Sequence, residues 1–333
     1  MRMIQFPHVV CSRFVVFILI CGSFAEGTNA QINQESSAPF TSVCLTQTGQ
    51  LISGSDFGLR THDLETLKPT KLLDSEIEKH YSITASPDGS KIAVSGGTPS
   101  ESGVVEVFSV PSMELVKRFV GFDDVATDVG WRSEDQLIAA SMTGNCRLFD
   151  LENKNSAGKN LSFNVHSQPI LAIGLLENQE IISAGKDNSI RVWKFDSPNK
   201  ARILNNHIDV VSDIAVQPSQ SKDNGNKAPM IASVSHDGTA RFWQPTIGRM
   251  IRFARLDSVP SCVTWSRDGS AAIIGCRDGS ILLLDPQTAK QVSKSKSEGW
   301  IFDMTLSNDG NSVIVATENG LRRVKLVTNH AAK

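Results

Sequence analysis

The feature that most constrains the fold is a short motif, a turn followed by an apolar strand, which recurs along nearly the whole chain. It is clearest as KDNSIRVW, HDGTARFW and RDGSILLL, which begin at Lys186, His236 and Arg277. Taking the glycine of each turn, or Asn188 in its place, the seven copies stand at positions 58, 103, 144, 188, 238, 279 and 320. Successive copies are therefore 41 to 50 residues apart, and a period of that size indicates a repeat architecture.

A second element precedes each copy: an alternating segment, a turn and an apolar run, as in SITASPDGSKIAVSG and CVTWSRDGSAAIIG. Alternation with a period of two predicts a strand with two different faces, and runs such as KIAV and SVIVA predict buried strands. With a more polar outer strand, each unit predicts a four-stranded antiparallel sheet. Because one such sheet cannot bury both of its faces alone, we expect an all-β fold, a seven-bladed β-propeller with the sheets packed around an axis.

The motif and its spacing resemble the WD40-repeat β-propeller family over roughly residues 40–328. The resemblance is most specific in the fourth and fifth units, where every member of the family's structural tetrad has a match. These residues are His166, Ser183, Asp187 and Trp193 in the fourth unit, and His207, Ser233, Asp237 and Trp243 in the fifth. The resemblance implies that the imidazole bridges the carboxylate and the hydroxyl, and that the hydroxyl accepts the indole N–H, so that buried polar groups are satisfied. The other five units lack a matching His, and we expect apolar packing to hold them.

The N-terminus differs from the repeats. Arg2 and Arg13 precede an apolar run at 14–20, which is followed by small residues. That order is typical of a secretory signal peptide, and the run is shorter than the ~20 residues of a membrane-spanning helix. We therefore expect a periplasmic or secreted protein with no stable membrane span; an uncleaved anchor is the alternative. The expected organisation is a signal peptide at 1–30, cleaved after Ala25 or Ala30, an N-terminal segment at 31–40 that could close the ring as a strand, the propeller at 41–328, and a tail at 329–333.

Charge and cysteine content argue against several classes of protein. The formal net charge is −2 with both signs interspersed, which does not suit a nucleic-acid-binding protein. Four cysteines lie outside the signal, none in a Cys-x-x-Cys pair or near a histidine at metal spacing, so we expect no metal site. Cys262 and Cys276 flank the turn SRDGS and could form a disulfide across a hairpin; free buried thiols are the favoured alternative.

No catalytic constellation stands out. The sequence has no Gly-x-Ser-x-Gly, no Walker-type glycine loop and no His-Glu-x-x-His, so we predict no catalytic residue and no cofactor. His236 is adjacent to Asp237 and follows Ser235, but adjacent residues of one turn point apart, whereas the members of a catalytic triad converge from separate segments.

Aspartates open the first strand of three units, at Asp128, Asp213 and Asp303. In a propeller these positions share one mouth of the central channel. They are either an acidic rim for a cation or a basic group, or carboxylates that cap backbone N–H groups. The second interpretation is favoured because hard cations need six or more oxygens. Together with aromatic residues beside them, which suit interface hot spots, they give a predicted partner-binding rim of His80, Tyr81, Phe122, Asp128, Asp213, Trp300, Phe302 and Asp303.

Taken together, the sequence favours a non-catalytic, exported propeller, expected to be monomeric, that binds a protein or peptide. The alternative is an enzyme, or a propeller that binds a small ligand or cation at the channel mouth, with the three aspartates as ligands. A fold alone does not decide between these functions.

Overall fold

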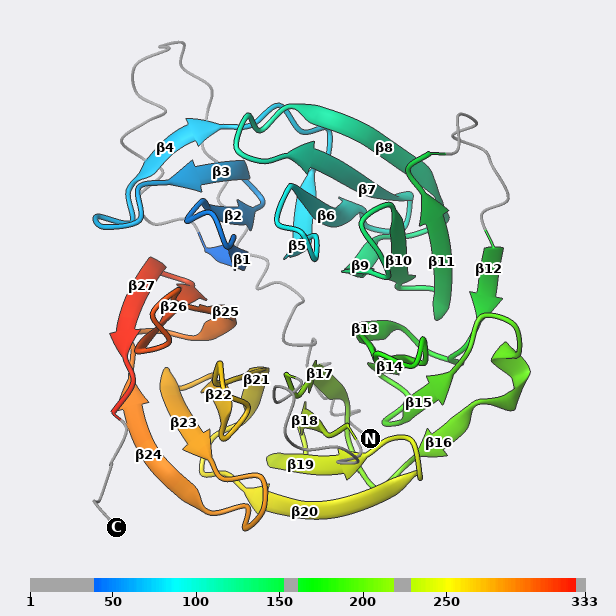
Figure 1. The fold of residues 1–333 in the computed structure, drawn as a ribbon, viewed down its shortest axis with the longest axis vertical. Helices are drawn as coiled ribbons and strands as arrows, with labels where there is room; N and C mark the ends of the chain where they lie inside the picture. Colours follow the sequence, from blue (N-terminus) through cyan, green and yellow to red (C-terminus); the bar gives the residue numbers. More distant parts are fainter. Residues whose placement is uncertain (1–38, 153–160, 219–228, 328–333) are drawn as a thin grey trace, which may run out of the picture.

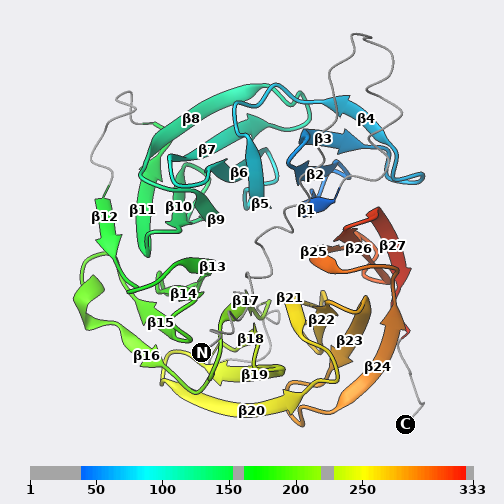
Figure 2. The same ribbon diagram turned by 180° about the vertical axis from the view of Figure 1, so that it is seen from behind.

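The computed structural model describes residues 39–152, 161–218 and 229–327, which form seven antiparallel sheets around one axis. The sheets follow one another around the ring in chain order, so that the first, drawn in blue, lies beside the last, drawn in red (Figures 1 and 2). The prediction of a seven-bladed β-propeller is confirmed. Six blades have four strands, and the described residues of the seventh contribute three.

The strands are numbered along the chain, and each blade runs from its innermost to its outermost strand. Blade 1 comprises β1 (Phe40–Leu45), β2 (Leu51–Ser55), β3 (Gly58–His62) and β4 (Pro69–Leu72), and blade 2 comprises β5 (Lys79–Ala85), β6 (Lys91–Thr98), β7 (Ser102–Ser109) and β8 (Leu115–Phe122). Blade 3 comprises β9 (Ala126–Trp131), β10 (Gln136–Ser141), β11 (Asn145–Asp150) and β12 (Leu161–Asn164). Blade 4 comprises β13 (Ile170–Leu175), β14 (Ile181–Gly185), β15 (Ile190–Trp193), the short 3-10 helix η2 (Pro198–Lys200) and β16 (Arg202–Leu204).

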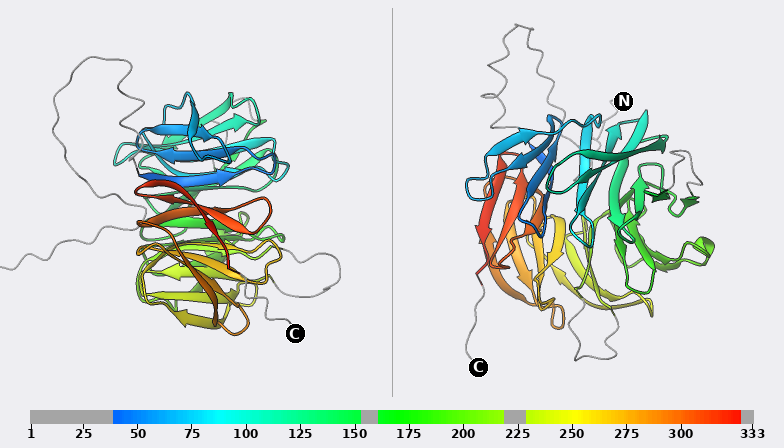
Figure 3. Two further views of the ribbon diagram at one scale, coloured as in Figure 1. Left: turned by 90° about the vertical axis from the view of Figure 1, so that its left-hand side faces the viewer. Right: turned by 45° about the horizontal axis from the view of Figure 1, so that its top comes forward.

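The remaining blades repeat this plan. Blade 5 comprises β17 (Val211–Val216), β18 (Ile231–Ser235), β19 (Thr239–Gln244) and β20 (Arg249–Arg255), and blade 6 comprises β21 (Pro260–Trp265), β22 (Ala272–Cys276), β23 (Ser280–Leu284) and β24 (Gln291–Lys296). Blade 7 comprises β25 (Ile301–Leu306), β26 (Ser312–Thr317) and β27 (Gly320–Lys325). Seen from the side, loops project from both faces of the ring (Figure 3).

The core lies between neighbouring blades, because the second strand of each sheet is apolar on both faces. Every residue of β14, β18 and β22 is buried, whereas the outer strand β20 is largely exposed. Trp243 packs with Leu204 and Val211 between blades 4 and 5. This is the burial that a single sheet could not achieve alone.

The hairpin turns require a left-handed backbone at one position. Gly238 and Gly279 have φ of 75° and 83°, and the matching position of blade 4 is Asn188, with φ of 63°. Glycine adopts this conformation without strain, and asparagine tolerates it better than most side chains. That tolerance explains why Asn188 replaces the repeat glycine.

Blades 7 and 1 are joined through their innermost strands. Val43 N donates to Asp303 Oδ2 at 2.9 Å, and Leu45 N donates to Thr305 Oγ1 at 3.3 Å. Residues 31–38 of the predicted closing segment lie outside the described residues, as do the predicted signal peptide at 1–30 and the tail at 329–333. Phe40 belongs to β1, the innermost strand of blade 1.

The predicted alternative of a Cys262–Cys276 disulfide is wrong. Both thiols are free and buried. Cys276 pairs with Pro260 in the ladder and Cys262 pairs with Gly275, so the two cysteines are not cross-strand partners. Cys262 packs with Met304 toward blade 7, whereas Cys276 packs with Phe242 toward blade 5. The side chains therefore leave opposite faces of the sheet, a geometry that a disulfide cannot span.

Candidate functional site at the channel mouth

The turns between second and third strands meet the connections between blades at one end of the ring, which we call the mouth face. His236 N donates to Val210 O at 2.9 Å, and Arg277 N donates to Val259 O at 3.0 Å. In each pair, the turn of one blade is tied to the connection that enters the same blade. The predicted tetrads and the predicted rim both lie at this end.

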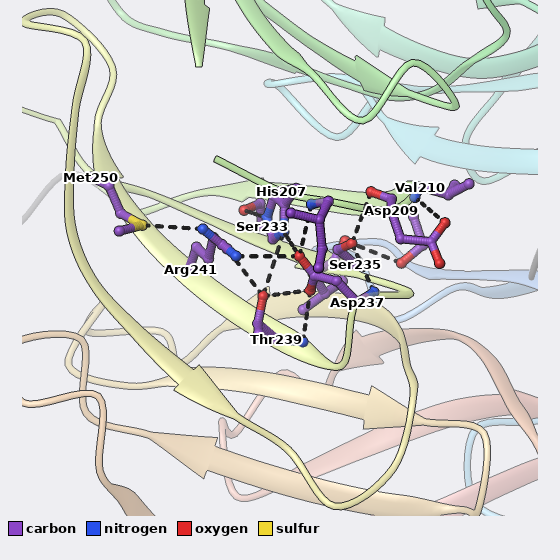
Figure 4. A network of polar contacts seen from close by, with 12 residues as sticks. His207, Asp209, Val210, Ser233, Ser235, Asp237, Thr239, Arg241 and Met250 are labelled. Carbon is purple, nitrogen blue, oxygen red and sulfur yellow. Dashed lines mark hydrogen bonds and ion pairs between the residues drawn. The ribbon is translucent and has the colours of Figure 1, made fainter. Parts of the chain in front are cut away.

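The structure brings the four tetrad residues of blade 5 together, and Figure 4 shows three of them, His207, Ser233 and Asp237. His207 Nδ1 lies 2.8 Å from Asp237 Oδ2, and His207 Nε2 lies 2.8 Å from Ser233 Oγ. The indole N–H of Trp243 donates to Ser233 Oγ at 2.9 Å. With a neutral imidazole protonated at Nδ1, each nitrogen of His207, the Ser233 hydroxyl and the indole N–H of Trp243 all have hydrogen-bond partners within the tetrad, as buried polar groups require.

The electrostatics of this tetrad favour an ionised aspartate and a neutral histidine. Burial alone would raise the pKa of Asp237, but hydrogen bonds from His207 and Thr239 outweigh it and hold that pKa well below its ordinary value. Burial lowers the pKa of His207 despite its hydrogen bond to Asp237. Arg241 also contacts Asp237, at 3.3 Å. The group is a structural support with no access for a substrate.

Blade 4 has the same arrangement. His166 Nε2 lies 2.8 Å from Ser183 Oγ, and His166 Nδ1 lies 3.0 Å from both oxygens of Asp187. Trp193 donates to Ser183 Oγ at 3.1 Å. The two blades whose sequences carry all four residues therefore build the same network.

Two related networks were not predicted. In blade 1, His62 pairs with Leu51 as Trp243 pairs with Ile231, and His62 Nε2 lies 2.7 Å from Ser53 Oγ. In blade 2, the fully buried Glu106 pairs with Arg118 at 2.8 Å. In blade 1 the available signal was Ser53, the third residue of the apolar strand β2, but the position that Trp243 occupies in blade 5 is held by His62 and not by a tryptophan.

The three aspartates of the predicted ring are clamps between blades. Asp128 accepts from its neighbour Val129 N and from Ile173 N of blade 4, and Asp213 accepts from Ile214 N and from Val263 N of blade 6. Asp303 accepts from Met304 N and from Val43 N of blade 1 in the same way. Both oxygens of each carboxylate hold backbone N–H groups, which argues against a shared role as cation ligands.

The predicted partner-binding rim is wrong for the five of its residues that are buried: His80, Tyr81, Phe122, Asp128 and Asp213. His80 fits between blades 1 and 2, where its Nδ1 lies 2.9 Å from Ser55 O. Phe122 packs edge-on against Phe149 beneath the guanidinium of Arg147. The connections between blades are short, so aromatic residues at their ends fill the space between sheets.

The other rim residues, Trp300, Phe302 and Asp303, are partly exposed. Trp300 stacks on Phe302 with ring centroids 5.0 Å apart, and the Arg277 guanidinium lies 4.7 Å from the Trp300 ring. Arg277 Nη2 in turn lies 2.7 Å from His236 Nε2. We call His236, Arg277, Trp300 and Phe302 the mouth cluster. It joins turns of blades 5 and 6 to the start of blade 7.

His236 and Arg277 were missed as members of a site, and so were two apolar residues of the same face. Phe57, in the turn of blade 1, is 57% exposed, and Ile208, before blade 5, is 81% exposed. Both residues lie outside the strands, where apolar and polar residues do not alternate. The sequence pattern therefore gave no reason to select them.

His236 makes stability depend on pH. Its pKa is lowered to about 4 by burial and by the neighbouring Arg277, whereas an unfolded histidine titrates near pH ~6.5. Between those values the unfolded chain binds a proton that the folded chain does not, so the free energy of unfolding must fall as the pH falls. In urea titrations from pH ~7 to ~4, we expect His236→Gln to have a shallower pH dependence than the parent chain. Equal slopes would contradict this assignment.

Within the described ranges, no three His, Cys, Asp or Glu side chains are grouped to hold a metal ion. In the same ranges, no helix has the length and hydropathy needed to span a bilayer.

Comparison with known proteins matches the WD40 model, a WD domain or G-beta repeat, to residues 159–194 and 199–244, which contain both tetrads. The chain is 28% identical over 217 residues to the Periodic tryptophan protein 2 homolog of Dictyostelium discoideum, covering 63% of this chain and 22% of that protein. It is 26% identical over 241 residues to Striatin-4 of Homo sapiens (64% and 31%), and 26% identical over 160 residues to the Methylosome protein WDR77 of Xenopus laevis (46% and 46%).

The chain thus spans less than half of the length of each of these relatives. Two repeats match the family model directly, and the remaining five blades have the same strand order and the same antiparallel pairing. Residues 159–194 and 199–244 match the WD40 repeat model, and the described residues have the seven-bladed propeller fold in a chain that is similar to WD40-repeat proteins.

Proposed function

We propose that this protein is a non-catalytic, exported scaffold that binds a protein or peptide partner on its mouth face. The observation that carries the proposal is the mouth cluster. Trp300 and Arg277 belong to the residue types that dominate binding energy at interfaces, and each is partly exposed on the mouth face.

The comparisons support the protein-binding part of this proposal. One relative is named as a protein of the methylosome, an assembly, and WD40 relatives as a group support a protein-interaction scaffold. The structural tetrads support it as well, because they hold the blades rigid, and a rigid surface loses little entropy when it binds.

Export is proposed from residues 1–30, where the charged start, short apolar run and small residues suit a cleaved signal. Mass spectrometry of the protein from producing cells tests it. A chain beginning at Glu26 or Gln31 supports export, and an intact N-terminus in the cytosol contradicts it.

Trp300→Ala is expected to weaken capture of the partner by about thirtyfold, which corresponds to the loss of about 2 kcal/mol at a hot spot. Because Trp300 is only partly buried, the melting temperature should change little. The measurement is crosslinking in intact cells followed by quantitative identification of what is captured.

The matched control is Phe253→Ala, since Phe253 is an aromatic residue 47% exposed on the outer strand β20, away from the mouth face. Capture that survives Trp300→Ala but is lost in Phe253→Ala would place the binding surface on the outer rim and refute the proposal.

A further inference from the structure

The mouth face is strongly acidic. Eleven Asp and Glu side chains in its loops are exposed, spread over blades 1, 2, 5, 6 and 7, and they include Asp56, Asp123, Asp209, Asp278, Glu298 and Glu318. Its described loops carry two cations, Lys186 and Arg277, both half-buried, and Lys79 stands at the start of β5. Arg118 of β8 pairs with Glu76 at 2.6 Å, and the exposed Arg255 and Lys296 end β20 and β24 at this face. In the described loops of the mouth face, no lysine or arginine is exposed.

The opposite face has mixed charge. Its described loops also contain carboxylates, but exposed cations stand among them at Lys68, Lys194, Lys200, Arg267 and Lys290. Some of the carboxylates there stabilise their own turns: Asp63 and Asp285 each accept a backbone N–H group of the turn in which they lie. The described loops of the opposite face thus mix exposed charges of both signs, whereas the exposed charged side chains in the described loops of the mouth face are all acidic.

Apolar groups stand within the acidic surface. Phe57 and Ile208 are exposed on opposite sides of the mouth, and the mouth cluster lies between them in chain order around the ring. The indole N–H of Trp300 is shielded from solvent and has no acceptor among the described residues. An extended polypeptide laid on this face would bring apolar side chains against Phe57, Ile208 and the mouth cluster.

A surface of this kind selects among partners by charge. Exposed carboxylates repel nucleic acids and anionic lipids, and they attract a positively charged segment and speed its encounter. Apolar anchors inside a charged field then fix the bound segment.

We infer that the segment recognised by the mouth face is a basic polypeptide, rich in lysine or arginine, with at least one apolar residue. This inference rests on the proposed function, because it names the partner chemistry of the same surface.

The test uses the full mature chain and a short lysine- and arginine-rich peptide with one leucine, against the same peptide with glutamate at each basic position. Binding is followed by intrinsic tryptophan fluorescence between about 0.05 and about 0.5 M NaCl. We expect the basic peptide to bind at least about tenfold more tightly than the acidic one at low salt, and to weaken as salt rises.

The decisive variant is Glu78→Gln/Glu298→Gln/Glu318→Gln, which removes three negative charges from the mouth face. Its matched control is Glu65→Gln/Glu114→Gln/Glu177→Gln, which removes three exposed charges from the opposite face. We expect a loss of about tenfold in basic-peptide affinity for the first variant and less than about twofold for the second.

Equal losses in the two variants, or no preference for the basic peptide, would overturn the inference. The proposed function is judged separately, by capture of the cellular partner. If Trp300→Ala abolishes capture but the three mouth-face Glu→Gln changes leave it intact, the proposed scaffold function is supported and the inference of a basic partner is rejected. If Trp300→Ala has no effect on capture, the proposed function fails as well.

Discussion

Trp243→Ala is expected to lower the free energy of unfolding by about 3–5 kcal/mol, the range for removing a large aromatic side chain from a core. Trp243 is 0% exposed and packs between blades 4 and 5. The change also removes the hydrogen bond that its indole donates to Ser233. Packing between blades and the polar network of the tetrad are therefore lost together.

Urea unfolding of the purified protein measures this effect, and Trp300→Ala is the matched control. The same substitution at the partly exposed mouth cluster should cost less than about 1 kcal/mol. Similar losses for the two variants would mean that the division between a structural tryptophan and a surface tryptophan is wrong.

Asp213→Ala is expected to cost about 2–4 kcal/mol, because it leaves two backbone amides of a buried interface without an acceptor. Ile214 N and Val263 N donate to its two oxygens at 2.9 and 2.8 Å. Since Val263 belongs to blade 6, the carboxylate joins adjacent blades as well as capping its own strand.

Asp213→Asn separates these contributions, since the amide keeps one oxygen acceptor and loses the other. It should cost about half as much as the alanine variant. If both variants unfolded at the parental urea concentration, the clamp between blades would contribute nothing, and the conserved geometry at Asp128 and Asp303 would need another explanation.

The repeat could be predicted from the sequence because each of its turns and strands is specified by residues that are close together in the chain. A hairpin turn needs a residue that tolerates positive φ, and a strand buried on both faces needs an apolar run. These needs recur in each blade, so Gly238, Gly279 and Asn188 mark the period. The tetrads were readable for a related reason, because Ser, Asp and Trp keep one spacing within a hairpin.

The surface was harder to predict, because it depends on contacts between blades. A bulge at the start of each first strand, such as that between Val211 and Asp213, redirects the side chain that follows. Asp213 therefore points toward blade 6 and away from the open mouth. The contact of His236 with Arg277 joins turns 41 residues apart. The sequence of neither turn indicates that the two side chains meet.

The acidity of the mouth face could not be predicted either, because it also depends on how the blades are arranged. Its carboxylates come from many separate loops, and each loop has an ordinary composition. Only the strand order of the propeller places Asp56, Asp209 and Glu318 on one surface.

The central claim is that the mouth face is the binding surface, and site-specific photo-crosslinking in producing cells tests it most directly. A photoreactive amino acid is placed at Phe57 or Ile208 on the mouth face, and at Ile247 or Leu115, which are 62% and 42% exposed at the opposite face. Because all four positions are exposed, each can react with whatever lies against it. We predict discrete adducts of the same partner from Phe57 and Ile208 and none from Ile247 and Leu115. Adducts from Ile247 or Leu115, with none from the mouth face, would contradict the claim.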